Sequence, residues 1–589
     1  FIRGKIKSED ENPLNRFFIR IYHPLVDFVL KWRWPSLLVA LLLIVSIAWP
    51  LWLAPRPLGS EFMPPLYEVD LLYMPTTLPG ISTTKARELL QQTDQIIASF
   101  PEVERTFGKV GRAETATDPA PLSMLETTIM LKPEDDWRQV HKDRFYSDWP
   151  DGLNFLKTVL GWVWPEQQRI DIKGLIAELD REIQFPGLTN AWTMPIRARI
   201  DMLSTGIKTP VGIKIMGDDL DVLADFGVQI EALMRRQEGT LSAFSERVVG
   251  GYYLDFEVDR RAAARYGLTV GQAQEIIQTA IGGVNITQTV EGLERYTVNL
   301  RYQRDFRNDL DSLKRVLVPL QDGAHVPISQ LAKLEILQGP PMIKSENASQ
   351  TAWVYVDLRN IDIGTFVARA QQAVAENIRL PEGYSLVWSG QYEYLQAAQK
   401  RFLIIIPLTV LLILLIIYLS TRSLIKTAIV LLAVPFSLIG AFWILYLLGY
   451  NMSVAAWIGI IALAGLDAET GVVMLLYLDI SHRRWKEQGR MQTRGDLVQA
   501  IHHGAVRRVR PKIMTIMVII FGLLPIMWSQ GTGADVMKRI AAPMIGGVTT
   551  SGIMELLIYP IIYYLWRGYK LRPETSATGS CLDETFRKK

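Results

Sequence analysis

The run AAWIGIIALAGLDAETGVVMLLYL, at residues 455–478, is long enough to cross a lipid bilayer and carries two carboxylates, Asp467 and Glu469, near its middle. An ionisable side chain at that depth costs roughly 2.5 to 3.5 kcal/mol on insertion scales, so such residues usually belong to a proton, ion or substrate pathway. The alternative is a buried core helix of a soluble protein, and the other long apolar runs of the chain disfavour it. The stretch therefore predicts a membrane protein with functional acids inside the bilayer.

The composition supports a membrane protein and excludes several other classes. Hydrophobic residues make up 49% of the 589 residues, and the 16 tryptophans are typical of anchoring at the membrane interface. The net charge of +3 is small, and no basic block alternates with aromatic residues, so nucleic acid is not an expected partner. The single cysteine, Cys581, excludes internal disulfides and cysteine-rich metal sites. We expect no permanently bound cofactor.

Six apolar runs predict one membrane span followed, after a long interval, by five more. The predicted spans are residues 34–53, 402–420, 425–448, 453–478, 513–528 and 540–566. The leader at residues 1–33 and the loop at residues 481–511 are strongly basic, and both lie on the same side if six helices cross the membrane. Because basic loops stay in the cytoplasm, the pattern predicts a cytoplasmic leader, a cytoplasmic tail at residues 567–589 and an external domain at residues 54–400.

The external domain shows repeated strand–helix–strand patterns joined by proline and glycine turns. The predicted sets are residues 69–74, 84–100 and 126–132, then 211–217, 220–236 and 252–258, then 352–359, 366–378 and 384–390. Repeated βαβ units of this kind indicate ferredoxin-like subdomains of the α+β class, attached to an all-α bundle of six membrane helices. We expect strands 211–217 and 352–359 to lie in one sheet.

Six stretches resemble the heavy-metal branch of the resistance-nodulation-division (RND) efflux pumps, in particular the copper and silver exporters. They are LLYMPTTLPGIS (71–82), FGKVGRAETATDPAPL (107–122), RIDMLSTGIKTPVGIKIMG (199–217), AARYGLTV (263–270), HHGAVRRVRPKIMT (502–515) and RIAAPMIGG (539–547). The resemblance implies a proton-driven homotrimeric exporter of the bacterial inner membrane, working with a periplasmic adaptor and an outer-membrane channel. It also implies a first porter subdomain at residues 54–209, a second at 210–249 and 334–400, and a docking subdomain at 250–333.

Such pumps are tandems of two similar halves, and the chain resembles the second half. We therefore expect an N-terminal half as a partner. In the family, that half carries a membrane aspartate opposite the positions of Glu469 and Lys512.

Glu469 and Lys512 are the predicted proton relay. Desolvation favours the protonated form of a membrane carboxylate and a nearby cation favours the ionised form, so movement of Lys512 would switch proton binding by Glu469. The alternative for Lys512 is a snorkelling side chain at the mouth of its helix. Asp467, a possible second relay acid, stands where the family usually has a small residue, and it points about 200° away from Glu469 on a helix. Glu555 is another mid-membrane acid, without an assigned role.

The predicted metal ligands are Met74, Met124 and Met202, which match the methionines of the metal cleft in the copper and silver exporters. Thioethers suit the soft ions Cu(I) and Ag(I), whereas Zn(II) requires histidine, cysteine or carboxylate ligands. From the residues alone, these are three of 18 methionines, and core packing would be the ordinary interpretation. Predicted polar neighbours at the cleft mouth are Glu68, Asp118, Glu126, Arg199 and Lys208.

Residues 141–168 have no counterpart in the family pattern and predict either a decorated surface loop or a short amphipathic helix that covers a neighbouring subunit or the membrane surface. Two other functions stay open from the sequence. One is an RND pump for another cargo, a divalent metal or a lipid. The other is a non-transporting remnant or assembly subunit.

Overall fold

The computed structural model describes residues 13–64, 66–111, 121–141, 147, 157–158, 161, 166–529, 531–569 and 571. The predicted cleft residue Asp118 and most of the 141–168 insertion lie outside these ranges. The two ends of the insertion are described: His141 pairs with Gln167 where strands β5 (Gln139–His141) and β6 (Gln167–Arg169) form a two-stranded ribbon.

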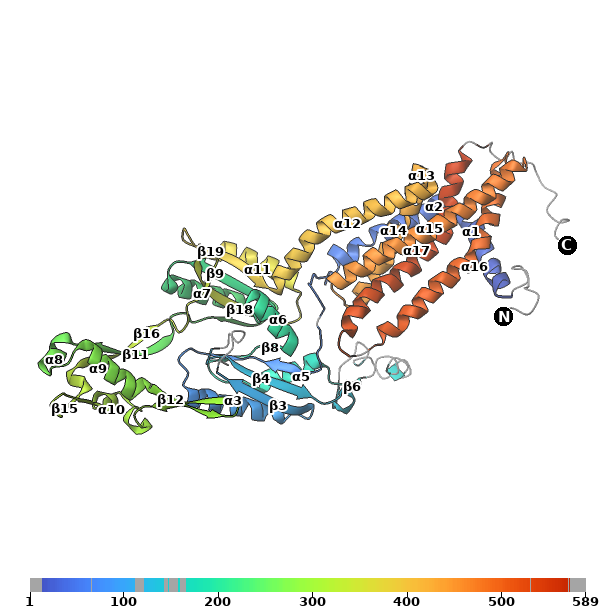
Figure 1. The fold of residues 1–589 in the computed structure, drawn as a ribbon. Coiled ribbons are helices and arrows are strands. Elements are labelled where there is room, and N and C mark those ends of the chain that lie inside the picture. Colours follow the sequence, from blue (N-terminus) through green and yellow to red (C-terminus); the bar gives the residue numbers. More distant parts are fainter. Residues whose placement is uncertain are drawn as a thin grey trace.

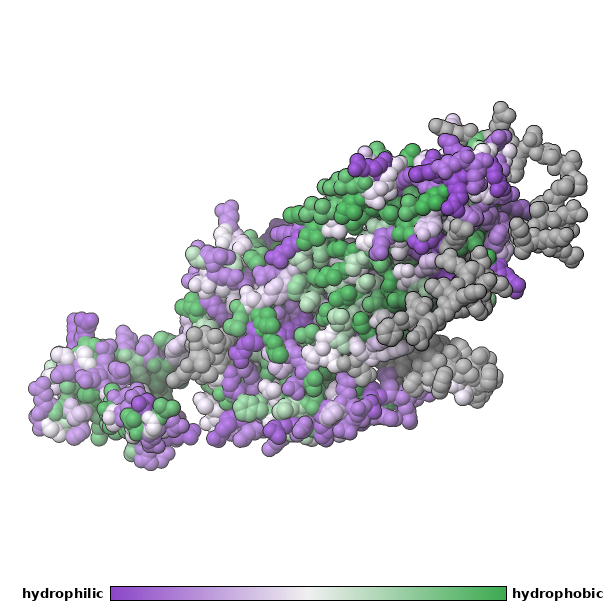
Figure 2. All heavy atoms as spheres, turned by 45° about the vertical axis from the view of Figure 1, so that its right-hand side comes forward, coloured by the Kyte–Doolittle hydropathy of each residue, from purple (hydrophilic) through white to green (hydrophobic). Residues whose placement is uncertain are grey.

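The described residues contain six helical segments long and apolar enough to span a membrane, as the sequence predicts. They are α2 with η2 (Arg33–Leu53), α12 (Gln391–Thr421), α13 with α14 (Leu424–Leu448), α15 (Val454–Glu487), α16 (Arg494–Met527) and α17 (Ala534–Gly568). They gather into one bundle on one side of the molecule (Figure 1). Figure 2 shows a hydrophobic surface over this bundle and hydrophilic residues at its end away from the sheets.

Helices α14 (Ala433–Leu448) and α17 form the centre of the bundle, where their backbones approach closely. A Cβ atom added to Gly440 would lie 2.0 Å from the carbonyl oxygen of Gly546, and one added to Gly546 would lie 2.3 Å from that of Gly440. Small residues permit this approach, which is a common way of packing helices in lipid.

Outside the bundle, two antiparallel sheets share one order of four strands. The first has the order β3-β4-β1-β8, built from β1 (Leu71–Tyr73), α3 (Thr83–Ala98), β3 (Val103–Val110), β4 (Leu125–Leu131), α5 (Ile172–Glu182) and β8 (Trp192–Thr193). The second has the order β10-β18-β9-β19, built from β9 (Val211–Gly217), α7 (Leu220–Arg235), β10 (Thr240–Ser245), β18 (Ser349–Leu358), α11 (Ile363–Asn377) and β19 (Ser385–Gly390). In both, these four strands follow the same sequence of second, third, first and fourth, and the second sheet has a short fifth strand, β17 (Ser345–Glu346), paired with β18.

The pairing of β9 with β18 confirms the prediction that strands 211–217 and 352–359 share a sheet. Ile213 lies opposite Val354 in an antiparallel register, and every residue of β9 is buried. Strand β9 is central because β18 and β19 flank it on either side, which explains its continuous apolar character.

Between β10 and β18, the chain leaves the second sheet and returns to it. Strand β11 (Gly251–Val258) leads outward and pairs along its whole length with the returning β16 (Ala332–Gly339). The outer unit between them lies farthest from the membrane helices (Figure 1). It contains α8 (Arg260–Arg265), α9 (Val270–Ile277), β12 (Val284–Glu291), β13 (Glu294–Leu300), α10 (Leu310–Lys314), β14 (Leu317–Pro319) and β15 (His325–Pro327).

The basic leader contains a helix that the charge pattern does not reveal. Helix α1 (Pro13–Lys31) buries Tyr22, Val26 and Leu30 against the bundle, and the Tyr22 hydroxyl donates a hydrogen bond of 2.8 Å to the carbonyl oxygen of Leu556 in α17. The leader is therefore part of the folded membrane domain.

Candidate functional site

The three predicted methionines converge. Met74 follows β1, Met124 forms an isolated β-bridge with Thr76 just before β4, and Met202 lies on helix α6 (Pro195–Thr205). They pack in one small apolar cluster together with Ala198. Met74 and Met124 are 1% and 7% exposed, and Met202 is half-buried at the edge of the cluster. The three side chains therefore meet in one cluster, and their role as metal ligands stays a prediction.

A pocket of about 110 Å³ opens beside this cluster. Its lining residues are Leu72, Met74, Glu126, Thr128, Pro195, Ala198, Arg199, Met202 and Leu203. Two of the predicted cleft residues, Glu126 and Arg199, therefore line it. Glu126 is held by an ion pair of 3.0 Å with Lys109 on the neighbouring strand β3. The pocket is therefore lined both by methionines, Met74 and Met202, and by charged side chains.

Helix α6 is fixed at both ends, which sets the position of Met202. Pro195 occupies the first turn, where its missing N–H is not needed. The Glu68 carboxylate accepts hydrogen bonds of 2.6 and 2.8 Å from the backbone N–H groups of Ile196 and Arg197. At the other end Gly206 adopts a φ of 77°, and a side chain there would meet the ring of Trp353. Glu68 therefore caps helix α6 and is not among the residues that line this pocket, and its place at the cleft mouth stays a prediction.

Lys208 is a buried cation that contacts the backbone of Met74 and is not among the residues that line the pocket. Its Nζ donates hydrogen bonds of 2.9 Å to the carbonyl oxygen of Met74 and 2.5 Å to Oγ1 of Thr76. Burial lowers the pKa of Lys208 to about 8, because the charged ammonium loses its hydration. A positive charge next to Met74 opposes a bound cation, so the protonation of Lys208 influences the pocket electrostatically.

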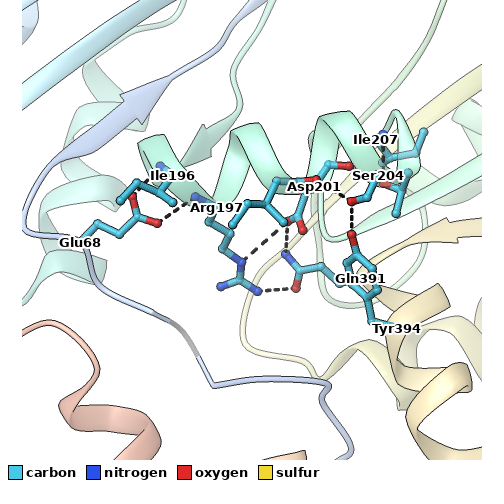
Figure 3. A network of polar contacts seen from close by, with 10 residues as sticks. Glu68, Ile196, Arg197, Asp201, Ser204, Ile207, Gln391 and Tyr394 are labelled. Carbon is cyan, nitrogen blue, oxygen red and sulfur yellow. Dashed lines mark hydrogen bonds and ion pairs between the residues drawn. The ribbon is translucent and has the colours of Figure 1, made fainter. Parts of the chain in front are cut away.

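A polar network connects the pocket helix to a membrane span (Figure 3). Arg197 Nη2 donates a hydrogen bond of 2.6 Å to Oε1 of Gln391, and Gln391 Nε2 donates one of 3.2 Å to Oδ2 of Asp201. One turn further along α6, Ser204 contacts the Tyr394 hydroxyl. Gln391 and Tyr394 belong to the first turn of α12, which continues into the bundle as a single helix (Figure 1). Movement of α12 would therefore be transmitted directly to the helix that carries Met202.

Inside the bundle, Lys512 is paired with Glu555 and not with Glu469. The Lys512 ammonium on α16 donates to the Glu555 carboxylate on α17, and the two side chains are 9% and 0% exposed. Thr470 adds a hydrogen bond of 3.1 Å to the other oxygen of Glu555. The predicted Glu469–Lys512 pairing is wrong in this structure, because Glu469 lies on the exposed face of α15.

Asp467 occupies the opposite, buried face of α15. It is 1% exposed, and within the described part of the chain its Oδ2 atom has no hydrogen-bond partner. The predicted angle of about 200° between Asp467 and Glu469 agrees with this separation of one buried acid and one exposed acid. Glu555, which the sequence left without a role, is the central acid of the group. The only sequence signal for it was its position in the middle of an apolar run.

Comparison with known proteins places the chain in a family. The model of the AcrB/AcrD/AcrF family matches residues 3–147 and 162–567. The cation efflux system protein SilA of Salmonella typhimurium is 45% identical over 569 residues, which cover 96% of this chain and 51% of SilA. The cation efflux system protein CusA of Escherichia coli K12 is 44% identical over 572 residues, covering 96% and 51%.

A crystal structure of a heavy metal efflux pump superposes with a TM-score of 0.78 at 25% identity, covering 95% of this chain and 52% of the pump. The chain thus spans about half the length of the relatives it matches. By its fold, its motifs and this similarity, the chain belongs to the AcrB/AcrD/AcrF family of RND transporters, in the branch of the heavy-metal efflux pumps.

Proposed function

We propose that the chain forms the second half of a proton-driven exporter of Cu(I) and Ag(I). The packing of Met74, Met124 and Met202 in one cluster, beside a pocket that Met74 and Met202 line, supports this cargo more than any other observation. Thioether sulfur is a soft, neutral ligand, so it prefers soft monovalent ions and needs no deprotonation. Among the described residues, the lining of this pocket contains neither histidine nor cysteine, and its one carboxylate, Glu126, provides too few ligands for a zinc site.

We assign the proton chemistry to the buried charges of the bundle. Lys512 and Glu555 form a desolvated pair, and Asp467 lies nearby on α15. Separation of Lys512 from Glu555 would leave an uncompensated buried carboxylate, which would then take up a proton, and renewed pairing would release it. Glu469 keeps its predicted place in the relay as an acid on the outer face of α15, where the resemblance places the aspartate of the first half.

Coupling between the two sites would pass through α12. Gln391 and Tyr394 bind α6 at one end of this helix, and the remainder of it lies in the bundle. A proton-linked shift of the membrane helices would therefore move α6 and change the access of ions to Met202. Helix α12 would thus connect proton binding in the bundle to metal binding at the pocket.

The assembly follows from the family. We propose a homotrimer in the bacterial inner membrane, completed by an N-terminal half, a periplasmic adaptor and an outer-membrane channel. In this assembly the two sheets are ferredoxin-like porter subdomains facing the periplasm, and the outer unit between β11 and β16 is the docking subdomain. The common strand order of the two sheets supports this division.

Metal binding by the purified chain tests the cargo, because the proposed ligands all belong to this chain. Calorimetric titration in detergent should show Ag(I) binding, and any Zn(II) binding should be unchanged in Met202→Ile. Met202→Ile keeps the apolar volume and removes one sulfur, so it should abolish Ag(I) binding. Met216→Ile, a buried methionine of β9 outside the cluster, is the matched control and should bind normally. Undiminished Ag(I) binding in Met202→Ile would refute the assignment.

A further inference from the structure

A second group of potential metal ligands lies on helices α1 and α16. Asp27 Oδ2 is 3.2 Å from Nδ1 of His23, and Asp27 Oδ1 is 2.7 Å from Nε2 of His502. The two imidazole rings stack with centroids 4.4 Å apart and planes inclined by 20°. One ligand atom from each of the three residues lies within 4.8 Å of the others. Two segments separated by nearly the whole sequence therefore place two imidazoles and a carboxylate together.

The positions of these residues are fixed by packing that does not depend on their own contacts. His23 and Asp27 are four residues apart on α1, so they project from the same face. The other face of α1 is anchored to the bundle by the buried Tyr22 and Val26. His502 is 12% exposed on α16 and cannot turn away freely. A preformed arrangement of this kind binds an ion without a large cost of ordering the ligands.

The chemistry of the group differs from that of the methionine pocket. Imidazole nitrogen and carboxylate oxygen suit borderline divalent ions such as Zn(II), Co(II), Ni(II) and Cu(II), whereas the thioethers suit Cu(I) and Ag(I). His23 and Asp27 are 54% and 55% exposed, so an ion can enter and water can complete its coordination. A divalent ion would accept one nitrogen lone pair from each imidazole and one oxygen of the carboxylate.

We propose that His23, Asp27 and His502 form a binding site for a divalent transition-metal ion. The bound ion would crosslink α1 to α16. Because Lys512 follows His502 on the same helix at a rise of about 15 Å, an occupied site would restrain the helix that carries half of the buried Lys512–Glu555 pair. The proposal depends only on the geometry of these three residues and stands independently of the Cu(I) and Ag(I) assignment.

Cobalt gives a direct probe of the proposed site. The full chain, purified in detergent without a polyhistidine tag, would be titrated with Co(II) and followed by visible absorption, then competed with Zn(II). We expect one Co(II) per chain, with ligand-field bands that Zn(II) abolishes, and a higher thermal midpoint with Zn(II). His502→Ala and His23→Ala should each remove the bands and the Zn(II)-dependent shift. Because His23 is exposed, its replacement tests the site without disturbing packing.

His503→Ala is the matched control. His503 is adjacent to His502, but its Nδ1 lies 3.4 Å from the Ser481 hydroxyl on α15, so it contacts a different helix. This variant should retain the Co(II) spectrum. Absence of the spectrum in the parent chain, or its persistence in both His23→Ala and His502→Ala, would show that the three residues form only a hydrogen-bonded contact between helices and would overturn the proposal.

Discussion

The buried Lys512–Glu555 pair provides the sharpest prediction about the membrane domain. Glu555→Gln keeps the shape of the side chain and the acceptor for Thr470 but removes the charge opposite Lys512. Because both side chains are almost inaccessible, the remaining ammonium has no solvent to replace its partner. Breaking a buried pair in this way typically costs about 3–5 kcal/mol. We expect Glu555→Gln and Lys512→Met each to lower the free energy of unfolding by about this amount.

The double variant distinguishes an ion pair from two independent contributions. When both charges are removed, no uncompensated ion stays in the bundle, so the combined loss should be far smaller than the sum of the two single losses. Denaturation in mixed micelles, followed by circular dichroism, measures the three free energies of unfolding. The exposed Lys314–Asp311 pair is the control, and Asp311→Asn should cost less than about 1 kcal/mol. Additive losses in the double variant, or a Glu555→Gln loss no larger than that of Asp311→Asn, would refute the reasoning.

Three further predictions address the pocket, the bundle and the topology. Because the folded-state pKa of Lys208 is about 8 against an ordinary 10.5, the unfolded chain binds more protons between these values, so stability should rise with pH across that window. Ag(I) affinity, measured by calorimetry, should likewise increase as the pH passes about 8, and Lys208→Met should abolish both effects. Gly440→Ala should destabilise the bundle by about 1–3 kcal/mol in the same unfolding assay, since its Cβ would meet the backbone of α17 at 2.0 Å, while Gly465→Ala, with no atom within 4 Å, should be tolerated. A reporter active only in the periplasm should be positive when fused within residues 54–400 and negative after Gly489, and the opposite pattern would contradict the proposed orientation.

Much of the architecture could be predicted from local sequence signals. All six predicted spans coincide with helices, because an apolar run of that length specifies a span without reference to its neighbours. Strand 211–217 was predicted to share a sheet with residues 352–359, and it pairs with β18 as expected. The methionine cluster is different, since its three members are distant in sequence. The family resemblance predicted their convergence, and no periodicity in the chain could have done so.

Features that depend on packing between helices were harder to predict. The sequence did not predict helix α1, because the basic charge of the leader indicates on which side of the membrane it lies but not its conformation. The partner of Lys512 was expected on α15, at Glu469, from the depth of that acid and the family resemblance, yet the ion pair forms with Glu555 on α17. In a membrane helix both faces are apolar, so the hydrophobic periodicity that identifies the inner face of a soluble helix is weak.

Close contacts with α17 identify the inner face of α15. Asp467 lies eight residues after Gly459 and four residues before Gly471, so all three share one side of the helix. A Cβ on Gly459 would lie 2.4 Å from the carbonyl oxygen of Ile540, and one on Gly471 would lie 2.9 Å from the Tyr559 hydroxyl, both on α17. Small residues mark the surface where membrane helices approach closely. These contacts place Asp467 on the face of α15 that packs against α17, whereas a Cβ on Gly465, four residues before Glu469, would meet no atom of the described residues within 4 Å, and Gly465 lies with Glu469 on the open face.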